Sequence, residues 1–479
     1  MKRGVNTLLI LTLLTGLLIT SCSQMSQSGG KISTKYNWDP MPKPREGGSA
    51  LMNLRVYRTT LDNGLRVLIY PNNRLPIFSY YVYYDVGGRH ERKGVDTGAT
   101  HYLEHMMFKG TKKYTGKSFF NFIEGVGGNA NAYTTFDSTV YHENVPSDAL
   151  ERVIDMEADR MNEILLDPKE VEKERIVVFE ERKKSYENSP RGQLYLKGMQ
   201  AIFEGVPYGG SVIGEVEDLK SLTREGLLKF HDQFYAPNNA IVVIAGDVDP
   251  DKTLDLLKKY YGPLKPRKDL KEFKEQKDNR SLYSHRGRYK RWIKLNSTSK
   301  SPMFMMGYKG EPLGTERSYV MDVLASIIGD GNSSYLNQTF VKSRKPSLAS
   351  VSTFNYTLKH NGVFWVSGSL LDRSNLGRVK NRLAKELKKS CDKAIDDRTL
   401  QKAKNQYLVG YFQGIQTNAG MASFLGSQEN YFGDYAHYLK EIDIYNGITV
   451  DQLKKTCHEL FDGDEYIFLS SWEKHPEKK

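Results

Sequence analysis

Apolar and polar positions follow one another along the chain in two successive series with the same order of elements. Short apolar or alternating runs predict strands, and apolar residues three and four apart predict helices. In the first half the predicted strands cover 65–70, 77–86, 130–141 and 240–245, and the helices 100–108, 117–125, 147–165, 168–187, 193–203 and 223–234. In the second half strands near 292–295, 303–308, 349–358 and 362–368 accompany helices near 316–328, 374–390, 397–413 and 449–459. The pattern predicts an α+β protein of two similar α/β-sandwich domains, each a largely antiparallel sheet packed with helices.

A charged stretch separates the two series. Residues 265–290 contain few apolar side chains and are expected to be a linker. This places a first domain at 49–264 and a second at 291–475. A chain of 479 residues is also too long for one ordinary core, which agrees with two domains.

The first 21 residues have the pattern of a secretory signal peptide, with basic residues followed by an apolar run. That run, 8–19, is too short to span a membrane. Residues 22–48 are polar, rich in Ser, Gly, Lys and Pro, and are expected to be a flexible tether.

The sequence Ile19-Thr20-Ser21-Cys22 resembles a bacterial lipobox. The resemblance implies that Cys22 carries lipid and becomes the first residue of the mature chain. Because Ser23 is not an aspartate, it further implies the outer membrane, with the protein facing the periplasm of the cell envelope. The alternative is a plain secreted protein with an incidental cysteine.

The overall charge and the cysteines narrow the picture further. The net charge is +12, but no clustered basic arm with interleaved aromatic residues accompanies it, so no nucleic-acid partner is expected. Beyond Cys22 the chain contains Cys391 and Cys457. They could form one disulfide in an oxidising compartment, a pairing that the sequence does not decide.

The segment His101-Tyr102-Leu103-Glu104-His105 carries the most specific chemistry of the chain. Histidines four apart on a helix lie on one face and can share a metal ion, with a glutamate between them on nearly the same side. The surrounding residues are mostly apolar, so the helix is expected to be buried and its polar side chains need partners. The alternative is an ordinary helix with core histidines whose hydrogen bonds are satisfied.

A second helix offers a third ligand. Asp167-Pro168 followed by Glu170 is a strong helix start. At about 100° per residue, Glu174 and Glu181 lie two turns apart on one stripe, whereas Glu180 points about 100° away. Carboxylates in a partly apolar stripe are costly to bury without a cation, although the alternative is a solvated, charged helix.

Around these two helices the chain resembles the pitrilysin/insulinase family of zinc peptidases, whose H-x-x-E-H order inverts the commoner H-E-x-x-H. It is closest to their shorter branch, which includes the mitochondrial processing peptidases and many bacterial members. The resemblance rests on the segments 98–111, 62–67, 127–134, 157–161, 172–175 and 246–248. In that family two α+β domains form half of a clamshell, whose chamber admits peptides and excludes folded proteins.

The resemblance implies a zinc endopeptidase with one Zn²⁺ per chain. By position, His101, His105 and Glu181 match the metal ligands, and Glu104 matches the general base that activates the attacking water. Glu174 matches an acid that orients a ligand from the second shell of the metal.

Two further positions concern the substrate. Asn131 and Ala132 match residues that contact it near the cleavage site, where a peptide is expected to lie against the edge strand at 128–133.

The second half departs from the family pattern. Catalytically complete members carry an arginine and a tyrosine there, which grip the substrate and help to stabilise the oxyanion. The matching positions fall on Val341, or close to it, and on Ser350. We therefore expect a second subunit, either another copy or a paralogue, to supply the missing pair. The alternatives are a catalytically inactive structural or assembly subunit and a peptide-binding protein of the same fold.

Overall fold

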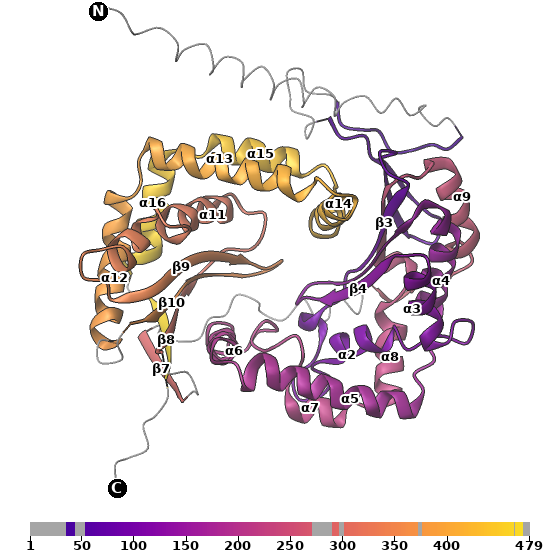
Figure 1. The fold of residues 1–479 in the computed structure, drawn as a ribbon, viewed down its shortest axis with the longest axis horizontal. Coiled ribbons are helices and arrows are strands. Elements are labelled where there is room, and N and C mark those ends of the chain that lie inside the picture. Colours follow the sequence, from indigo (N-terminus) through magenta and orange to yellow (C-terminus); the bar gives the residue numbers. More distant parts are fainter. Residues whose placement is uncertain are drawn as a thin grey trace, which may run out of the picture.

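The computed structural model describes residues 35–43, 53–270, 290–296, 301–371, 376–463 and 465–472. The chain forms two sheet-plus-helix domains arranged as a crescent (Figure 1), as the alternating pattern predicted. The predicted signal peptide, Cys22 and most of the predicted tether and linker lie outside the described residues. Within the described part, no helix is both long enough and apolar enough to cross a membrane.

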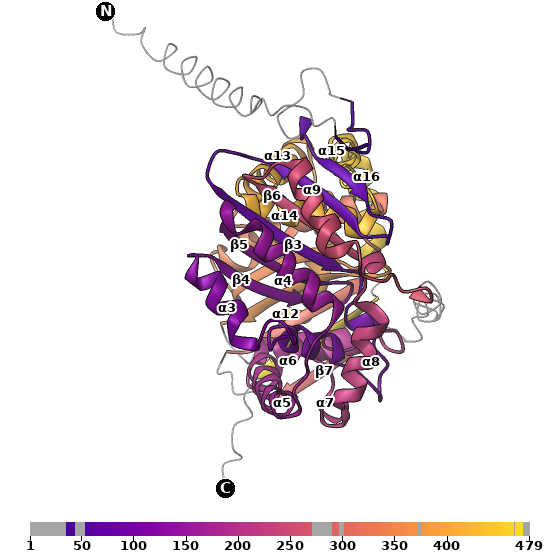
Figure 2. The ribbon, with the colours of Figure 1, turned by 90° about the vertical axis from the view of Figure 1, so that its right-hand side faces the viewer.

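The first sheet has six strands in the order β1-β2-β6-β3-β5-β4, and only β2 and β6 run parallel. Its strands are β1 Tyr57–Thr60, β2 Arg66–Pro71, β3 Ile77–Tyr84, β4 Asn129–Thr134, β5 Thr139–Pro146 and β6 Ala240–Gly246. The helices of this half are α2 Ala99–Met106, α3 Gly116–Gly125, α4 Leu150–Asn162, α5 Pro168–Arg182, α6 Pro190–Ile202, α7 Val216–Ser221, α8 Arg224–Phe234 and α9 Pro250–Tyr261. Figure 2 shows α3, α4 and α9 lying over this sheet.

The single strand predicted at 130–141 is wrong, because these residues form a hairpin of β4 and β5. The chain reverses at Thr135–Ser138, where the Thr135 hydroxyl accepts hydrogen bonds from the backbone N–H groups of Asp137 and Ser138. A hydroxyl can stabilise a turn in this way without the glycine or asparagine that usually signals one.

The second sheet repeats the first. Its strands are β7 Lys290–Asn296, β8 Met303–Lys309, β9 Leu348–Thr357, β10 Gly362–Leu370 and β11 Tyr466–Trp472. They are ordered β7-β11-β8-β10-β9, with only β7 and β11 parallel. This order matches β2-β6-β3-β5-β4 strand for strand, so β4 and β9 occupy equivalent edges. The helices of this half are α11 Glu316–Gly329, α12 Leu376–Lys393, α13 Asp397–Gly414, α14 Asn418–Phe432, α15 Tyr438–Gly447 and α16 Val450–Phe461.

One helix of each half packs on the sheet of the other half. In α6, Leu194, Met199 and Ile202 belong to the same apolar cluster as Trp365 and Leu469 of the second sheet. In α14, an apolar side made by Met421, Ala422 and Leu425 packs with residues of β3 and β6 in the first sheet. Both helices lie between the domains in Figure 1. Each sheet is therefore covered on one face by its own half and on the other by its neighbour.

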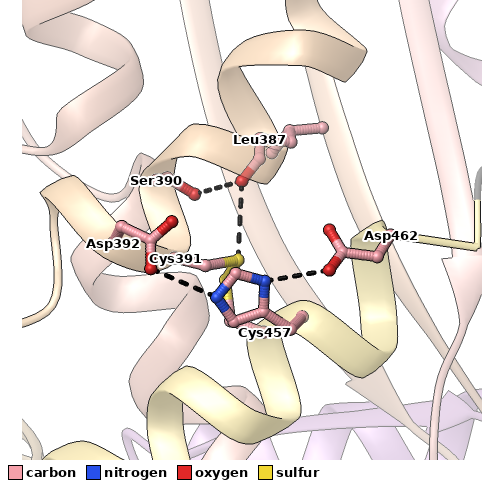
Figure 3. The surroundings of a disulfide bond; sticks show 7 residues. Leu387, Ser390, Cys391, Asp392, Cys457 and Asp462 are labelled. Atoms are coloured by element: carbon pink, nitrogen blue, oxygen red, sulfur yellow. Dashed lines mark hydrogen bonds and ion pairs between the residues drawn. A yellow bond between two sulfur atoms is a disulfide. The ribbon is translucent and has the colours of Figure 1, made fainter.

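A disulfide joins Cys391 in α12 to Cys457 in α16, which answers the question that the sequence left open (Figure 3). Both cysteines are fully buried. At the surface beside them, His458 lies between Asp392 and Asp462, at 3.3 and 2.9 Å. The bridge and this ion triad both tie α12 to α16.

Candidate metal centre

The helix that carries the H-x-x-E-H segment, α2, begins at a left-handed glycine and is held by a buried acid. Gly98, with φ 88°, is the residue before the helix. The backbone N–H groups of Gly98 and Thr100 donate to the Glu91 carboxylate at 2.7 and 2.8 Å. Burial raises the pKa of Glu91 to about 7, although these hydrogen bonds act in the opposite direction. Sequence reasoning missed Glu91, because no motif marks an acid that binds a helix start from a preceding turn.

The three residues predicted as ligands converge. His101 and His105 project from α2, and Glu181 projects from α5, which packs against α2. Nε2 of His101 lies 3.6 Å from Oε1 of Glu181, and Nε2 of His105 lies 3.3 Å from Oε2 of the same carboxylate. Two atoms bound to one zinc ion at about 2.0–2.2 Å are themselves roughly 3.3–3.6 Å apart in tetrahedral geometry. Among the described residues, this is the one group of three such ligands found.

Glu174 fixes the orientation of His105. Its carboxylate lies 2.8 Å from Nδ1 of His105, and its second oxygen lies 2.5 Å from Nζ of Lys109. With the Nδ1 proton donated to Glu174, a neutral His105 presents a lone pair at Nε2 to the carboxylate of Glu181. Two acceptors that close together require a cation between them, either a proton or a metal ion.

The electrostatics of the group agree with that requirement. Burial opposes protonation of His105, but hydrogen bonds with Glu174 and Glu181 outweigh it and raise the pKa of His105 to about 9. Hydrogen bonds from His101 and His105 hold the pKa of Glu181 well below its usual range. The neighbouring Glu180 points outward and pairs with Lys183 at the surface, so it takes no part in the group.

Glu104 is half-buried on α2 and reaches β4. One of its carboxylate oxygens accepts a hydrogen bond of 2.5 Å from the hydroxyl of Thr134, the last residue of β4. Glu104, His105, Phe108 and Asn131 line a cavity of about 760 Å³ beside the metal group. Thr134 was not singled out from the sequence, because its partner is 30 residues away on another element.

The predicted substrate positions lie on the same strand. Asn131 is exposed and Ala132 half-buried on β4, which pairs among the described strands with β5 alone. The other edge of β4 is open toward the cavity, so its backbone groups can pair with an extended peptide.

Among the described residues of the second half, no equivalent group of metal-binding side chains is found. Its counterpart of α2 is α11, where Asp322 bonds to Asn355 and Tyr445 instead of facing a ligand group. Val341 packs against the second core, and Ser350 lies exposed on β9 with its hydroxyl bonded to Ser369. Neither position supplies a guanidinium or a phenol.

Comparisons with known proteins agree with this arrangement. Residues 67–214 match the family described as insulinase (peptidase family M16), and residues 221–407 match the peptidase M16 inactive domain. The zinc protease PqqE of Helicobacter pylori is 30% identical over 398 residues, which cover 81% of this chain and 84% of that protein. An uncharacterised zinc protease of Bacillus subtilis, YmxG, is 24% identical over 87% of this chain and 98% of its own length.

Solved structures give the same answer for the fold. A protease from Helicobacter pylori superposes with a TM-score of 0.78 at 25% identity, covering 88% of this chain and 99% of that one. A peptidase M16 inactive domain from Pseudomonas fluorescens, 16% identical, has a TM-score of 0.75 over 89% and 99% of the two chains. The chain has two repeated domains, and in one of them two histidines and a glutamate converge. A relative is 30% identical over most of both lengths. The chain therefore belongs to the insulinase (peptidase M16) family.

Proposed function

We propose that this chain is the zinc-bearing subunit of an endopeptidase that cleaves peptides or unfolded protein segments. The observation that carries the proposal is the convergence of His101, His105 and Glu181 next to Glu104, at the open edge of β4. Several relatives are named as zinc proteases, which supports the same metal and reaction class.

The donor set suits zinc. Two imidazole nitrogens and one carboxylate are ligands that Zn²⁺ takes in catalytic sites, and three protein ligands leave one position open. The two imidazole Nε2 atoms face one carboxylate, that of Glu181, at 3.6 and 3.3 Å, distances that suit ligands of a single ion. When bound, zinc supplies a Lewis acid that polarises the scissile carbonyl and makes a water acidic enough to attack at neutral pH.

The protein side chains then move the protons. Glu104 accepts the proton of the attacking water and passes it to the nitrogen of the departing peptide. The Thr134 hydroxyl keeps the Glu104 carboxylate in one orientation, while Glu174, itself paired with Lys109, holds the imidazole of His105. The peptide pairs with the open edge of β4, which brings its scissile bond near Glu104 because Thr134 ends that strand.

We also propose that a second subunit completes the site. No arginine or tyrosine occupies the positions of Val341 and Ser350, and each oxyanion donor is typically worth about 10²–10³ in rate. The partner would present those groups from the equivalent region of its own second domain. The isolated chain is then weakly active, whereas the assembled enzyme is fast.

We further propose that the chain lies in the bacterial cell envelope, held by a lipid anchor. The lipobox-like segment ending at Cys22 supports a lipid anchor, and the Cys391–Cys457 disulfide supports an oxidising compartment such as the periplasm.

A quenched-fluorescent peptide assay on the purified chain and on the complex isolated from its native host tests the function. Wild type should cleave slowly alone and fast in the complex, and Glu104→Gln should abolish both activities while zinc stays bound. Full activity of the purified chain alone would remove the need for a partner. No activity in either sample, with zinc bound, would favour an inactive structural subunit.

A further inference from the structure

A second cavity, of about 570 Å³, lies between the two domains, over the part of the second sheet that α6 leaves uncovered. Where α6 packs, that sheet face carries Met305, Trp365 and Leu469. Farther along β9 and β10 the same face changes from apolar residues to serines. Figure 1 shows α6 beside β8, with β9 and β10 next to it.

Four serines of the sheet face this cavity as two cross-strand pairs. The hydroxyl of Ser350 lies 2.9 Å from that of Ser369, and Ser352 lies 3.1 Å from Ser367. Within each pair one hydroxyl hydrogen is used by the other oxygen, so the second hydrogen remains available to a ligand. The sheet therefore offers two O–H donors in a row.

The opposite wall is the start of α6, which adds the positive charge. Arg191, Ser185 and Ser189 line the cavity there, and none of the described residues of its lining is an aspartate or glutamate. Arg191 is exposed, and it has no ion pair with a residue that the structure describes. A guanidinium with nearby hydroxyls is a donor set that matches a carboxylate.

Close packing fixes the backbone next to Arg191. The helix α5 continues directly into a π-helix, Lys183–Glu187. A Cβ added to Gly192 would lie 1.8 Å from the carbonyl oxygen of Ser185 in that π-helix. Only glycine allows this approach, so the start of α6 sits directly against the π-helix. Arg191 precedes that glycine and is held at the cavity rim.

The cavity is close to the metal group. Ser185 follows the predicted ligand Glu181 by four residues on one continuous helix, a rise of about 6 Å. An extended peptide covers about 3.3 Å per residue, so the two sites are only a few peptide residues apart.

We propose that this cavity binds a carboxylate of the peptide substrate, through Arg191 and the paired serines, and so selects acidic peptides. The inference rests on the proposed peptidase function. The carboxylate belongs either to an aspartate or glutamate side chain a few residues from the scissile bond, or to the peptide C-terminus.

The test is calorimetric titration of zinc-loaded Glu104→Gln protein, which binds without cleaving. Three kinds of nonapeptide, built on one neutral sequence, serve as probes. The first is amidated, and the second has a free C-terminus. The third is amidated and carries one glutamate, which is placed at a different position in each version. The two acidic kinds distinguish a terminal from a side-chain carboxylate. Arg191→Gln is added to this background, with Lys197→Gln as the matched control, because Lys197 is exposed on the same helix outside the cavity.

We expect one kind of acidic peptide to bind tighter than the neutral peptide, and Arg191→Gln to weaken that peptide about tenfold. The neutral peptide, and every peptide with Lys197→Gln, should be unaffected. Equal affinity for acidic and neutral peptides, or equal losses in the two variants, would overturn the carboxylate site while wild-type cleavage still supported the peptidase. No binding of any peptide, together with no cleavage by wild type alone or in its native complex, would overturn both.

Discussion

Glu429 of α14 is fully buried and bonds to Arg58 of β1, with 2.9 Å between Oε1 and Nη2. The same carboxylate lies 3.3 Å from Nη1 of Arg66 on β2. A single acid from the second half therefore holds two cations of the first sheet, at the place where α14 crosses it. A separate ion pair also joins the halves, because Lys359 in the β9–β10 turn lies 3.3 Å from Asp85 of the first half.

Removing this acid should loosen the contact between the halves. We expect Glu429→Gln to lower the free energy of unfolding by about 1.5–3 kcal/mol, because charge-assisted hydrogen bonds are lost in a buried place. Urea unfolding measures it, with the exposed Glu180→Gln as control. Equal stability of Glu429→Gln and wild type would contradict a role for this contact.

Thr134 should matter for turnover and not for binding. Thr134→Val keeps the shape but removes the hydrogen bond to Glu104, so we expect kcat to fall about tenfold, the value of one such bond. KM and zinc content should stay the same, and Thr134→Ser should restore the rate. Steady-state kinetics on the native complex measures this, and an unchanged kcat in Thr134→Val would rule out the positioning role.

Zinc content should follow the geometry of α2 and α5. We expect about one zinc per wild-type chain by elemental analysis, and loss of it in His101→Ala, His105→Ala and Glu181→Gln. Glu174→Gln should weaken zinc binding about 10–100-fold without abolishing it, because Glu174 orients His105 and is not itself a ligand. Retention of zinc in Glu181→Gln together with its loss in Glu180→Gln would show that the third ligand is wrong.

Glu91 should make the stability depend on pH. Its pKa is raised by burial from 4.5 to about 7 in the folded protein, so between these values the folded chain holds a proton that the unfolded chain releases. Its contribution is therefore full below about pH 4.5 and is lost as the pH rises through about 7. The unfolding free energy of wild type should fall relative to Glu91→Gln by about 1–3 kcal/mol from pH 5 to 7.5. Parallel pH profiles of the two proteins would contradict this.

The lipid anchor is testable in cells of the native host. Wild-type protein should be found in the membrane fraction and should incorporate a fatty-acid analogue, whereas Cys22→Ala should do neither. A soluble, unlabelled wild type would favour the plain secreted alternative.

Much of the metal group could be predicted from local sequence, because helix periodicity alone places His101 beside His105 and Glu174 in line with Glu181. The structure brings these side chains together as that periodicity indicates. Contacts between distant elements could not be predicted in the same way. The hydrogen bond from Thr134 to Glu104 depends on where β4 ends, and the hairpin was missed because a threonine makes its turn.

The sequence also did not predict the helix α14, nor that α6 and α14 each pack on the sheet of the other half. The α14 segment is rich in glycine, serine and asparagine, so its apolar side, Met421, Ala422 and Leu425, gives only a weak pattern. An amphipathic pattern also predicts that one side of a helix is buried, but it does not predict which sheet buries it.

The exchange of α6 and α14 constrains how the chain is made. Synthesis proceeds from the N-terminus, so Tyr81, Tyr83 and Val243 of the first sheet have no cover until α14, which ends at Phe432, has been synthesised. Until then an apolar sheet face and its edges are open to aggregation, which makes the early chain a natural client for holding chaperones. For the same reason, a fragment that stops after the first half would expose this face, and expression of the metal-bearing half alone should give insoluble protein.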